Sequence, residues 1–274
     1  MDTPLVITVA LCGAEVSKEK NPYLPVKVEE IARDAIECYH LGATVAHIHV
    51  REEDGTPSSK VEYFAKVKEL IEKEVPMIIQ FTTGGAVGMT EEERMEPLKL
   101  KPHMATLNLG SMNFGDELFI NTPDFIKRLA LKMKELEIKP ELEVYDLGML
   151  DMVEYLVRNG FVDEPVHVDF VLGVRWGAAA TPENLLFMIN DLKRRNIQFT
   201  WSAAAVGKNQ LLINTLSIIL GGFVRTGLED NIYYRKGVLA TNQELVKRIV
   251  RMANELGRPI ADINQTKKLL NIGR

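Results

Sequence analysis

Short apolar runs alternate with amphipathic stretches along most of this chain of 274 residues. The runs have the length and β-branched composition of buried strands, and the stretches between them have the spacing of helices that pack on a sheet. Strands are predicted near Leu5–Leu11, Thr44–Val50, Met77–Phe81, Met104–Asn108, Glu141–Tyr145, Val166–Leu172, Gln198–Ser202 and Phe223–Arg225. Helices are predicted over Val28–Leu41, Lys60–Glu74, Asp124–Leu136, Leu147–Asn159, Pro182–Arg195 and Gln210–Leu220, with a final helix over Asn242–Leu256.

This alternation is typical of parallel βα units, and a closed (β/α)8 TIM barrel of the α/β class is the simplest way to arrange eight of them. A barrel of this size usually forms a single domain, so we expect one catalytic domain over residues 1–274. An open, doubly wound sheet is the alternative. It normally carries Gly-x-Gly-x-x-Gly after its first strand, where this chain has Cys12-Gly13-Ala14-Glu15.

The overall composition excludes several functional classes. A formal net charge of -5 is not the basic footprint of a nucleic-acid-binding protein. The longest apolar stretch, from Leu211 to Phe223, contains polar residues and is shorter than the roughly 20 residues that span a bilayer, so no membrane association is expected. The cysteines, Cys12 and Cys38, are too few for a disulfide framework and suit a reducing cytoplasm.

Two histidines, His47 and His49, lie one residue apart at the end of the second predicted strand. Alternate residues of a strand share a face, so the two side chains point the same way, about 6.7 Å apart along the strand. Two imidazoles in this arrangement can converge on one zinc ion. The alternative is that both are hydrogen-bonded to polar groups of the core or of the barrel mouth.

Other polar residues are also predicted to lie at the ends of strands. Catalytic groups of a TIM barrel gather at the carboxyl ends of its strands. The residues predicted to lie there are Glu15, His47, His49, Thr82, Thr83, Gly84, Gly85, Thr106, Asn108, Glu141, Glu143, Tyr145, Ser202, Arg225, Glu229 and Asp230. His167 begins its strand and His103 precedes its strand, so these two, with His40 of a helix, are expected to be structural.

Glu229 and Asp230 are adjacent, so their carboxylates can serve different partners. One could complete a His, His, Glu zinc site with an open coordination position. The other could act as a base, kept ionised by Arg225. The alternative is an arginine–carboxylate pair that only closes the barrel.

Two further segments suit an anionic ligand. Thr82-Thr83-Gly84-Gly85 offers hydroxyls and close backbone approach to a carboxylate or phosphate, although Gly-Gly is also common in plain turns. Barrels often bind phosphate with the loops after strands seven and eight. Lys208 and Arg225 are the candidates there, and Lys208 could equally be a solvent-exposed lysine.

Six stretches together resemble one known family, the β-keto acid cleavage enzymes. They occur in the family's order and span nearly the whole chain. The stretches are His47-Ile48-His49-Val50-Arg51, Thr83-Gly84-Gly85-Ala86-Val87-Gly88, Ala105-Thr106-Leu107-Asn108, Glu141-Leu142-Glu143-Val144-Tyr145, Phe170-Val171-Leu172-Gly173-Val174 and Gly227-Leu228-Glu229-Asp230-Asn231.

The resemblance implies a zinc-dependent TIM barrel, usually a homotetramer. Such an enzyme exchanges the acetyl part of a β-keto acid with acetyl-CoA, giving acetoacetate and a new CoA thioester by Claisen and retro-Claisen chemistry. The family's pattern makes His47, His49 and Glu229 the zinc ligands and Asp230 the base, oriented by Arg225. The substrate-binding residues would be Glu15, Thr82, Gly85, Thr106, Asn108 and Glu143.

The resemblance also bears on the substrate. Glu15 and Glu143 would face its distal end, where negative charge favours an ammonium group, as in 3-keto-5-aminohexanoate of lysine fermentation. The chain departs from the family pattern at Thr82, where serine is frequent, and in the segment Arg175–Ala180. Trp176 in that segment is expected to pack, or to shape the mouth through which CoA enters.

Two other readings remain open from sequence. A metal-dependent amidohydrolase also uses His-x-His on a barrel strand, but normally on strand one and with histidines from strands five and six. A non-catalytic protein with a structural zinc would more often use a closed, cysteine-rich set of four ligands.

Overall fold

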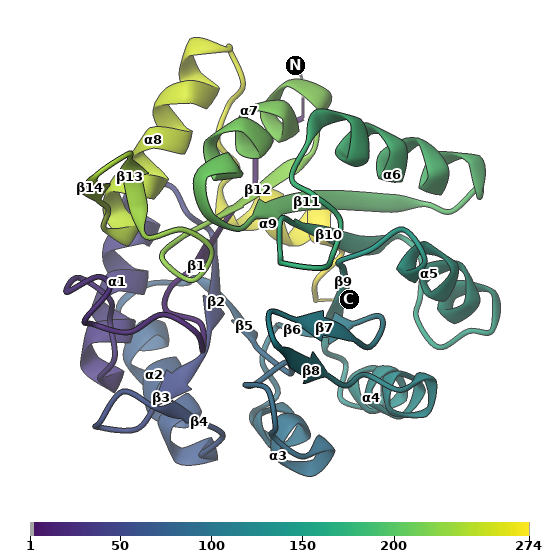
Figure 1. The fold of residues 1–274 in the computed structure, drawn as a ribbon, viewed down its shortest axis with the longest axis horizontal. Helices are drawn as coiled ribbons and strands as arrows, with labels where there is room; N and C mark the ends of the chain where they lie inside the picture. The colour runs from purple at the N-terminus through teal and green to yellow at the C-terminus, as the bar shows by residue number, and fades with distance from the viewer. Residues whose placement is uncertain (1–2, 274) are drawn as a thin grey trace.

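The computed structural model describes residues 3–273 and shows a closed barrel of parallel strands surrounded by helices, as predicted (Figure 1). Neighbouring barrel strands follow the order β1-β12-β11-β10-β9-β6-β5-β2. Each barrel strand therefore pairs with the barrel strands that come before and after it in the chain, and the first pairs with the last. The barrel strands are β1 (Ile7–Ala10), β2 (Val45–Ile48), β5 (Ile78–Phe81), β6 (Met104–Asn108), β9 (Lys139–Val144), β10 (Val166–Leu172), β11 (Phe199–Ala205) and β12 (Phe223–Thr226).

The predicted helices are present with small changes at their ends. They begin where a capping residue meets an amphipathic pattern: the hydroxyl of Thr181, for example, accepts the N–H of Asn184 ahead of a helix that starts with Pro182. The helices around the barrel are α1 (Val28–His40), α2 (Val61–Glu74), α3 (Glu91–Met95), α4 (Pro123–Glu135), α5 (Met149–Arg158), α6 (Pro182–Arg194), α7 (Gln210–Leu220) and α8 (Asn242–Glu255).

The prediction that the helix ending near Leu256 is the last one is wrong. A further helix, α9 (Ile263–Leu270), follows it and lies behind the barrel strands in Figure 1. Its Leu270 packs with buried residues near the amino-terminal ends of the strands, such as Val6, Val45 and Ile78. Helix α9 therefore closes the end of the barrel opposite to the strands' carboxyl ends.

The predicted end of the seventh barrel strand is also wrong. Strand β11 does not stop at Ser202 but continues to Ala205, paired with β10 as far as Leu172. Its last three residues are alanines without exposed surface, which allow the strand to continue among bulky neighbours. Ser202 therefore lies inside the barrel wall and not at its mouth.

Three short antiparallel hairpins lie in loops that follow barrel strands. They are β3 (Val50–Arg51) with β4 (Pro57–Ser58), β7 (Met112–Phe114) with β8 (Glu117–Phe119), and β13 (Tyr233–Arg235) with β14 (Val238–Leu239). None was expected from the strand pattern, because each strand is only two or three residues long. Among residues 3–273, no helix is long and apolar enough to cross a membrane.

Candidate active site

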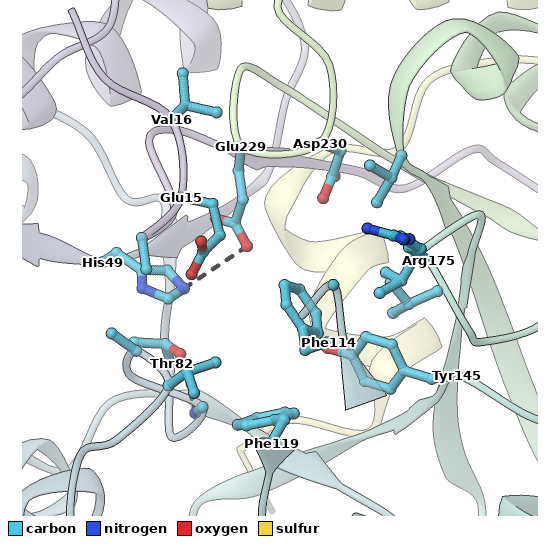
Figure 2. Close-up of a pocket in the computed structure, with 18 of the residues that line it drawn as sticks. Glu15, Val16, His49, Thr82, Phe114, Phe119, Tyr145, Arg175, Glu229 and Asp230 are labelled. Atoms are coloured by element: carbon cyan, nitrogen blue, oxygen red, sulfur yellow. Dashed lines mark hydrogen bonds and ion pairs between the residues drawn. The ribbon is translucent and has the colours of Figure 1, made fainter. Parts of the chain in front are cut away.

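The carboxyl ends of the barrel strands open into a cavity of about 640 Å³ (Figure 2). The tertiary structure brings most of the predicted site residues to this cavity. Those that line it are Glu15, His47, His49, Thr82, Gly84, Gly85, Asn108, Glu143, Tyr145, Arg225, Glu229 and Asp230. Thr106 has a different position: it is buried, and its hydroxyl accepts the backbone N–H of Thr83 at 3.0 Å. Thr106 therefore holds the loop after β5 in place from beneath.

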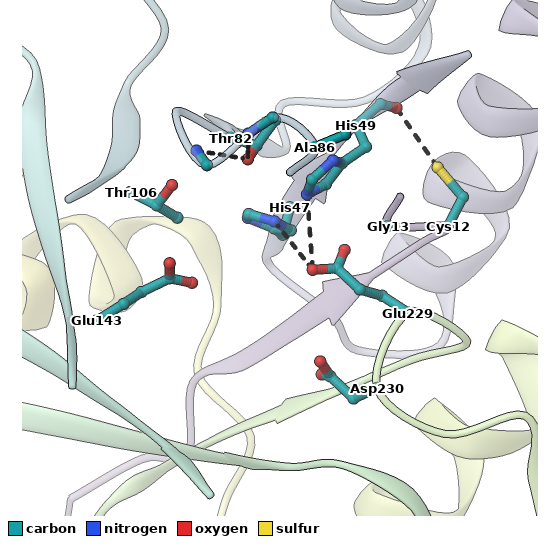
Figure 3. Close-up of polar contacts among 12 residues, drawn as sticks. Cys12, Gly13, His47, His49, Thr82, Ala86, Thr106, Glu143, Glu229 and Asp230 are labelled. Atoms are coloured by element: carbon teal, nitrogen blue, oxygen red, sulfur yellow. Dashed lines mark hydrogen bonds and ion pairs between the residues drawn. The ribbon is translucent and has the colours of Figure 1, made fainter. Parts of the chain in front are cut away.

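Three side chains converge at one side of the cavity as a candidate metal site. The ligand atoms of His47, His49 and Glu229 lie within 4.8 Å of one another (Figure 3). Oε1 of Glu229 is 3.4 Å from Nε2 of His47 and 3.6 Å from Nε2 of His49. Its other oxygen, Oε2, is buried and has no hydrogen-bond partner among the described residues. Two imidazole nitrogens and an unsatisfied carboxylate oxygen are the donor set that zinc takes in catalytic sites.

Neighbouring groups orient these ligands. Nδ1 of His47 lies 2.8 Å from Oε1 of Gln80 on strand β5, so the imidazole donates there and its Nε2 keeps a free lone pair toward the site. Gly13, in the loop after β1, approaches Glu229 closely: a Cβ at this position would lie 2.5 Å from Cγ of Glu229. Gly13 also has a φ of +56°, so glycine meets both a steric and a conformational requirement here.

Arg225 of strand β12 lies beside the candidate metal site and binds several carboxylates. Its Nε and Nη2 donate to both oxygens of Asp230, at 3.1 and 3.0 Å. Its Nη1 donates to Glu143 at 3.0 Å, and its Nη2 donates to Glu229 at 2.5 Å. The alternative prediction that Arg225 binds phosphate is therefore wrong, because its guanidinium is buried and bound to carboxylates of the chain.

Burial and neighbouring charges shift the pKa values of the ionisable groups in this cluster. Burial raises the pKa of Asp230 above its usual value, against the opposing effect of Arg225. In the same way burial raises the pKa of Glu143 to about 7. Burial also lowers the pKa of His49 to about 3, so this imidazole is neutral near pH 7. Glu229 differs: burial favours its neutral form, but His47 and Arg225 outweigh burial and hold its pKa well below its usual range.

The loop after β5 forms a candidate cradle for an anion. Oγ1 of Thr82 accepts the backbone N–H groups of Gly84 and Gly85, at 3.1 and 3.2 Å. The hydroxyl proton of Thr82 therefore remains available for a ligand. Gly85 has a φ of +62°, and a Cβ there would lie 2.7 Å from Sδ of Met89, so this turn requires glycine.

The two carboxylates predicted to face the distal end of a substrate lie at different depths. Glu15 is exposed in the loop after β1 and points into the pocket beside His49 and Glu229 (Figure 2). Glu143 is buried inside the barrel, where it binds Arg225 and accepts the hydroxyl of Tyr145 at 3.2 Å. Glu15 is thus the one of the two with a solvent-facing carboxylate.

A second group of polar residues inside the barrel was partly missed from sequence. Asp169 of β10 is fully buried, accepts the hydroxyl of Ser202 at 2.7 Å and lies 3.9 Å from Arg225. His167 contacts Thr200 at 2.9 Å, which confirms that it is not at the mouth. The signal was present in the sequence, because Asp169 alternates with His167 on the inward face of one strand.

An arginine and an aromatic wall were also missed as parts of the site. The buried guanidinium of Arg51 donates to the carbonyl oxygens of Cys12 and Gly13, at 2.9 and 2.7 Å, and so ties down the loop that carries Glu15. Phe114 and Phe119 of the β7–β8 hairpin pack edge to face across the pocket from that loop (Figure 2). Only the tertiary structure brings this hairpin over the barrel.

Comparison with known proteins identifies relatives over the full length of the chain. A family model described as beta-keto acid cleavage enzyme matches residues 4–272. The 3-keto-5-aminohexanoate cleavage enzyme of Fusobacterium nucleatum subsp. nucleatum is 48% identical, over 98% of this chain and 98% of its own. The enzyme of the same name from Acetoanaerobium sticklandii is 46% identical, over 98% and 99%. The 3-oxoadipate:acetyl-CoA acetyltransferase of Cupriavidus necator is 39% identical, over 99% and 96%.

Among solved structures, the apo structure of ObcA has the same fold. It superposes with a TM-score of 0.81 at 19% sequence identity, over 92% of this chain and 66% of that chain.

Proposed function

The chain belongs to the β-keto acid cleavage enzyme family, and we propose that it exchanges the acetyl part of a β-keto acid with acetyl-CoA in a zinc-dependent reaction. The products are acetoacetate and a new CoA thioester. One observation carries the proposal: the three ligand atoms of His47, His49 and Glu229 converge directly beside a carboxylate that Arg225 holds at two points. A metal-binding set and a positioned base in one pocket are the two components that enolate chemistry requires.

The residues present fit a zinc ion, with His47, His49 and Glu229 as its ligands. When bound, zinc would supply Lewis-acid stabilisation for the negative charge that develops on the ketone oxygen of the substrate. Asp230 removes a proton from C2 of the keto acid. Burial keeps the basicity of Asp230 above that of an ordinary aspartate, and Arg225 fixes the direction of its oxygens.

The remaining steps balance without a redox cofactor. The C2 carbanion attacks the thioester carbon of acetyl-CoA, forming a C–C bond and releasing CoA thiolate. The thiolate then attacks the original ketone and breaks its bond to C2. The leaving carbanion is that of acetoacetate, and Asp230 returns the proton to it. The original acyl group leaves as a CoA thioester.

The substrate is held at its two ends. The hydroxyl proton of Thr82 is suited to its carboxylate, since Oγ1 of Thr82 already accepts the N–H of Gly85, and the lack of a side chain at Gly85 allows the ligand to approach this loop closely. Asn108 lies nearby and is a further candidate, because both polar atoms of its buried side chain lack a partner among the described residues. The exposed carboxylate of Glu15 favours an ammonium group at the other end. We therefore propose 3-keto-5-aminohexanoate as the substrate, which would place the enzyme in lysine fermentation in the cytoplasm.

We also propose that the protein forms a homotetramer through apolar helix surfaces. Helix α7 contains no charged residue, and its outward-facing leucines and isoleucine are 40–47% exposed. A contiguous exposed apolar surface of this kind often marks a protein–protein contact. The neighbouring helix α6 adds Leu186 and Phe187, 41% and 48% exposed, to the same region.

The test is acetoacetate release by the purified protein with acetyl-CoA and a panel of keto acids, with and without zinc. The panel contains 3-keto-5-aminohexanoate, its 5-hydroxy analogue, 3-oxoadipate and dehydrocarnitine. The expected result is metal-dependent turnover that is highest for 3-keto-5-aminohexanoate and is lost in His47→Ala and Asp230→Asn. Absence of acetoacetate with every substrate, from folded protein with metal bound, would contradict the acyl exchange and favour a metal-dependent hydrolase.

A further inference from the structure

One aromatic side chain stands exposed at the rim of the pocket in an unusual backbone conformation. Trp176 is 62% exposed, so the expectation that it packs in the protein is wrong. Its φ of +77° lies in the left-handed region, which is unfavourable for a bulky residue and, where it occurs, often marks a functional segment.

Specific contacts keep the indole of Trp176 in this position. Its Nε1–H donates to the carbonyl oxygen of Gly115 in the β7–β8 hairpin at 2.7 Å. The guanidinium of Arg175 lies 4.7 Å from the centre of the ring, and Arg175 is itself anchored to Asp116 at 3.0 Å. Gly115, Asp116 and Arg175 all line the pocket, and Figure 2 shows Arg175 across the pocket from His49. The ring is thus held at the rim with much of its surface open to solvent.

Unpaired positive charges lie in the loops after the next two barrel strands, β11 and β12. Lys208 is exposed in the loop after β11, and Arg235 and Lys236 are exposed in the hairpin after β12. Across residues 3–273, none of these three side chains has a hydrogen bond or ion pair within the chain. We call Arg175, Lys208, Arg235 and Lys236 the basic arc.

Hydrogen bonds and packing join the loops that carry the basic arc and Trp176 to the candidate active site. The N–H of Gly207, next to Lys208, donates to the carbonyl oxygen of Asp230 at 2.8 Å. Nδ2 of Asn209 donates to the carbonyl oxygen of Ala180 at 3.0 Å and so connects the loop after β11 to the loop that carries Trp176. Strand β13 packs on Gly207–Asn209. Loops after these barrel strands are where phosphate is often bound.

We propose that Trp176 and the basic arc bind the nucleotide part of acetyl-CoA, with the adenine stacked on the indole and the phosphates along the arc. This proposal rests on the proposed function, which requires acetyl-CoA as co-substrate. The thioester must reach Asp230 inside the cavity, and the pantetheine arm separates it from the nucleotide. The nucleotide therefore lies at the rim, where the ring offers a stacking surface and the arc offers counter-charges for phosphate.

The test compares acetyl-CoA with S-acetylpantetheine, which has the same reacting group but no nucleotide. Trp176→Ala should raise KM for acetyl-CoA by about 5- to 150-fold, the range expected for loss of one stacked base, and leave the kinetics with S-acetylpantetheine unchanged. Trp176→Phe should restore most of the affinity. Lys208→Ala should raise KM for acetyl-CoA alone, with a stronger effect at low salt, while Lys247→Ala on the outer face of α8 should have no effect.

Equal changes with both thioesters, or no change with either, would overturn the proposal. A binding experiment separates its failure from failure of the proposed function. Addition of CoA, or of adenosine 3′,5′-bisphosphate, should quench tryptophan fluorescence of the wild type but not of Trp176→Phe, in which only the buried Trp201 emits. Quenching without turnover would contradict the acyl exchange and retain the nucleotide site. Turnover without quenching would contradict the nucleotide site alone.

Discussion

Arg225 binds Asp230 at two points, with Nε 3.1 Å from Oδ2 and Nη2 3.0 Å from Oδ1. A planar guanidinium that meets a carboxylate in this way fixes the plane of the carboxylate as well as its position. The ion pair is buried, so water does not compete for it. Asp230 is therefore a base whose direction is set before substrate arrives.

We expect Asp230→Asn to lower kcat by about 10²- to 10⁴-fold, the usual contribution of a general base. The amide is nearly isosteric but cannot accept the C2 proton. Zinc content, measured by elemental analysis, should remain that of the wild type. Enzyme-catalysed exchange of the C2 protons for deuterium, followed by NMR without acetyl-CoA, should be lost; exchange at the wild-type rate would exclude Asp230 as the base.

Gln80→Met should weaken zinc binding by about 10- to 100-fold, because His47 loses the acceptor that orients its ring. Competition with a chelator measures the change. Gln243→Met, at a partly exposed position of α8, is the control and should bind zinc like the wild type. Equal zinc affinity in both variants would show that His47 does not depend on Gln80.

Glu15→Gln should raise KM for 3-keto-5-aminohexanoate by about tenfold, since it removes the exposed negative charge that faces the ammonium group. The 5-hydroxy analogue has no positive charge, so its KM should hardly change. Steady-state kinetics with the two substrates give this ratio directly. Parallel changes for both substrates would assign Glu15 a role in shaping the loop.

The stability of the barrel should fall as the pH falls below about 6.5, through His103. Nδ1 of His103 accepts the N–H of Ile79 at 3.1 Å, and burial lowers the pKa of the imidazole from 6.5. Protons therefore bind the unfolded chain more readily, and the contribution of His103 is present above its unfolded pKa and lost as the pH falls through its folded pKa. Between about pH 7 and 5, the free energy of unfolding should decline more steeply for the wild type than for His103→Gln.

Leu212→Glu and Ile219→Glu should each dissociate the proposed tetramer, because they place a charge on the exposed apolar face of α7, where these residues are 45% and 47% exposed. Light scattering coupled to size exclusion measures the mass. Leu131→Glu, at a 50% exposed position of α4, is the control and should keep the mass of the wild type. A wild type that elutes as a monomer would contradict the tetramer itself.

Much of the fold could be predicted from sequence because its signals are local. Apolar runs such as Val166–Leu172 and caps such as Thr181 act within a few residues, and the observed elements follow them closely. The predicted element boundaries were wrong where local signals are weak. The alanines after Ser202 extend β11 because they pair with β10 in the packed barrel. Helix α9 forms because it packs against the amino-terminal ends of the barrel strands.

Pairs of functional residues close in sequence could be found in the same way. His47 lies on strand β2 and His49 directly after its end at Ile48, and Glu229 and Asp230 follow one strand, so local backbone geometry places the members of each pair near each other. Asp169 was missed although its alternation with His167 was visible, and for Trp176 the sequence left open whether it packs or shapes the mouth through which CoA enters. Whether a side chain is buried depends on elements distant in sequence, here the β7–β8 hairpin that holds the indole at the rim.

The sequence by itself determined the βα alternation and the local pairs of metal-binding and acidic residues, because strand and helix periodicity place side chains relative to their near neighbours. Only the tertiary structure decided that His47 meets Glu229 and that Arg225 meets Glu143. Closure of the barrel brings the carboxyl ends of β2, β9 and β12 together, and burial there shifts the pKa values of the acidic and histidine side chains. These contacts depend on the cooperative packing of the whole barrel, which no local pattern encodes.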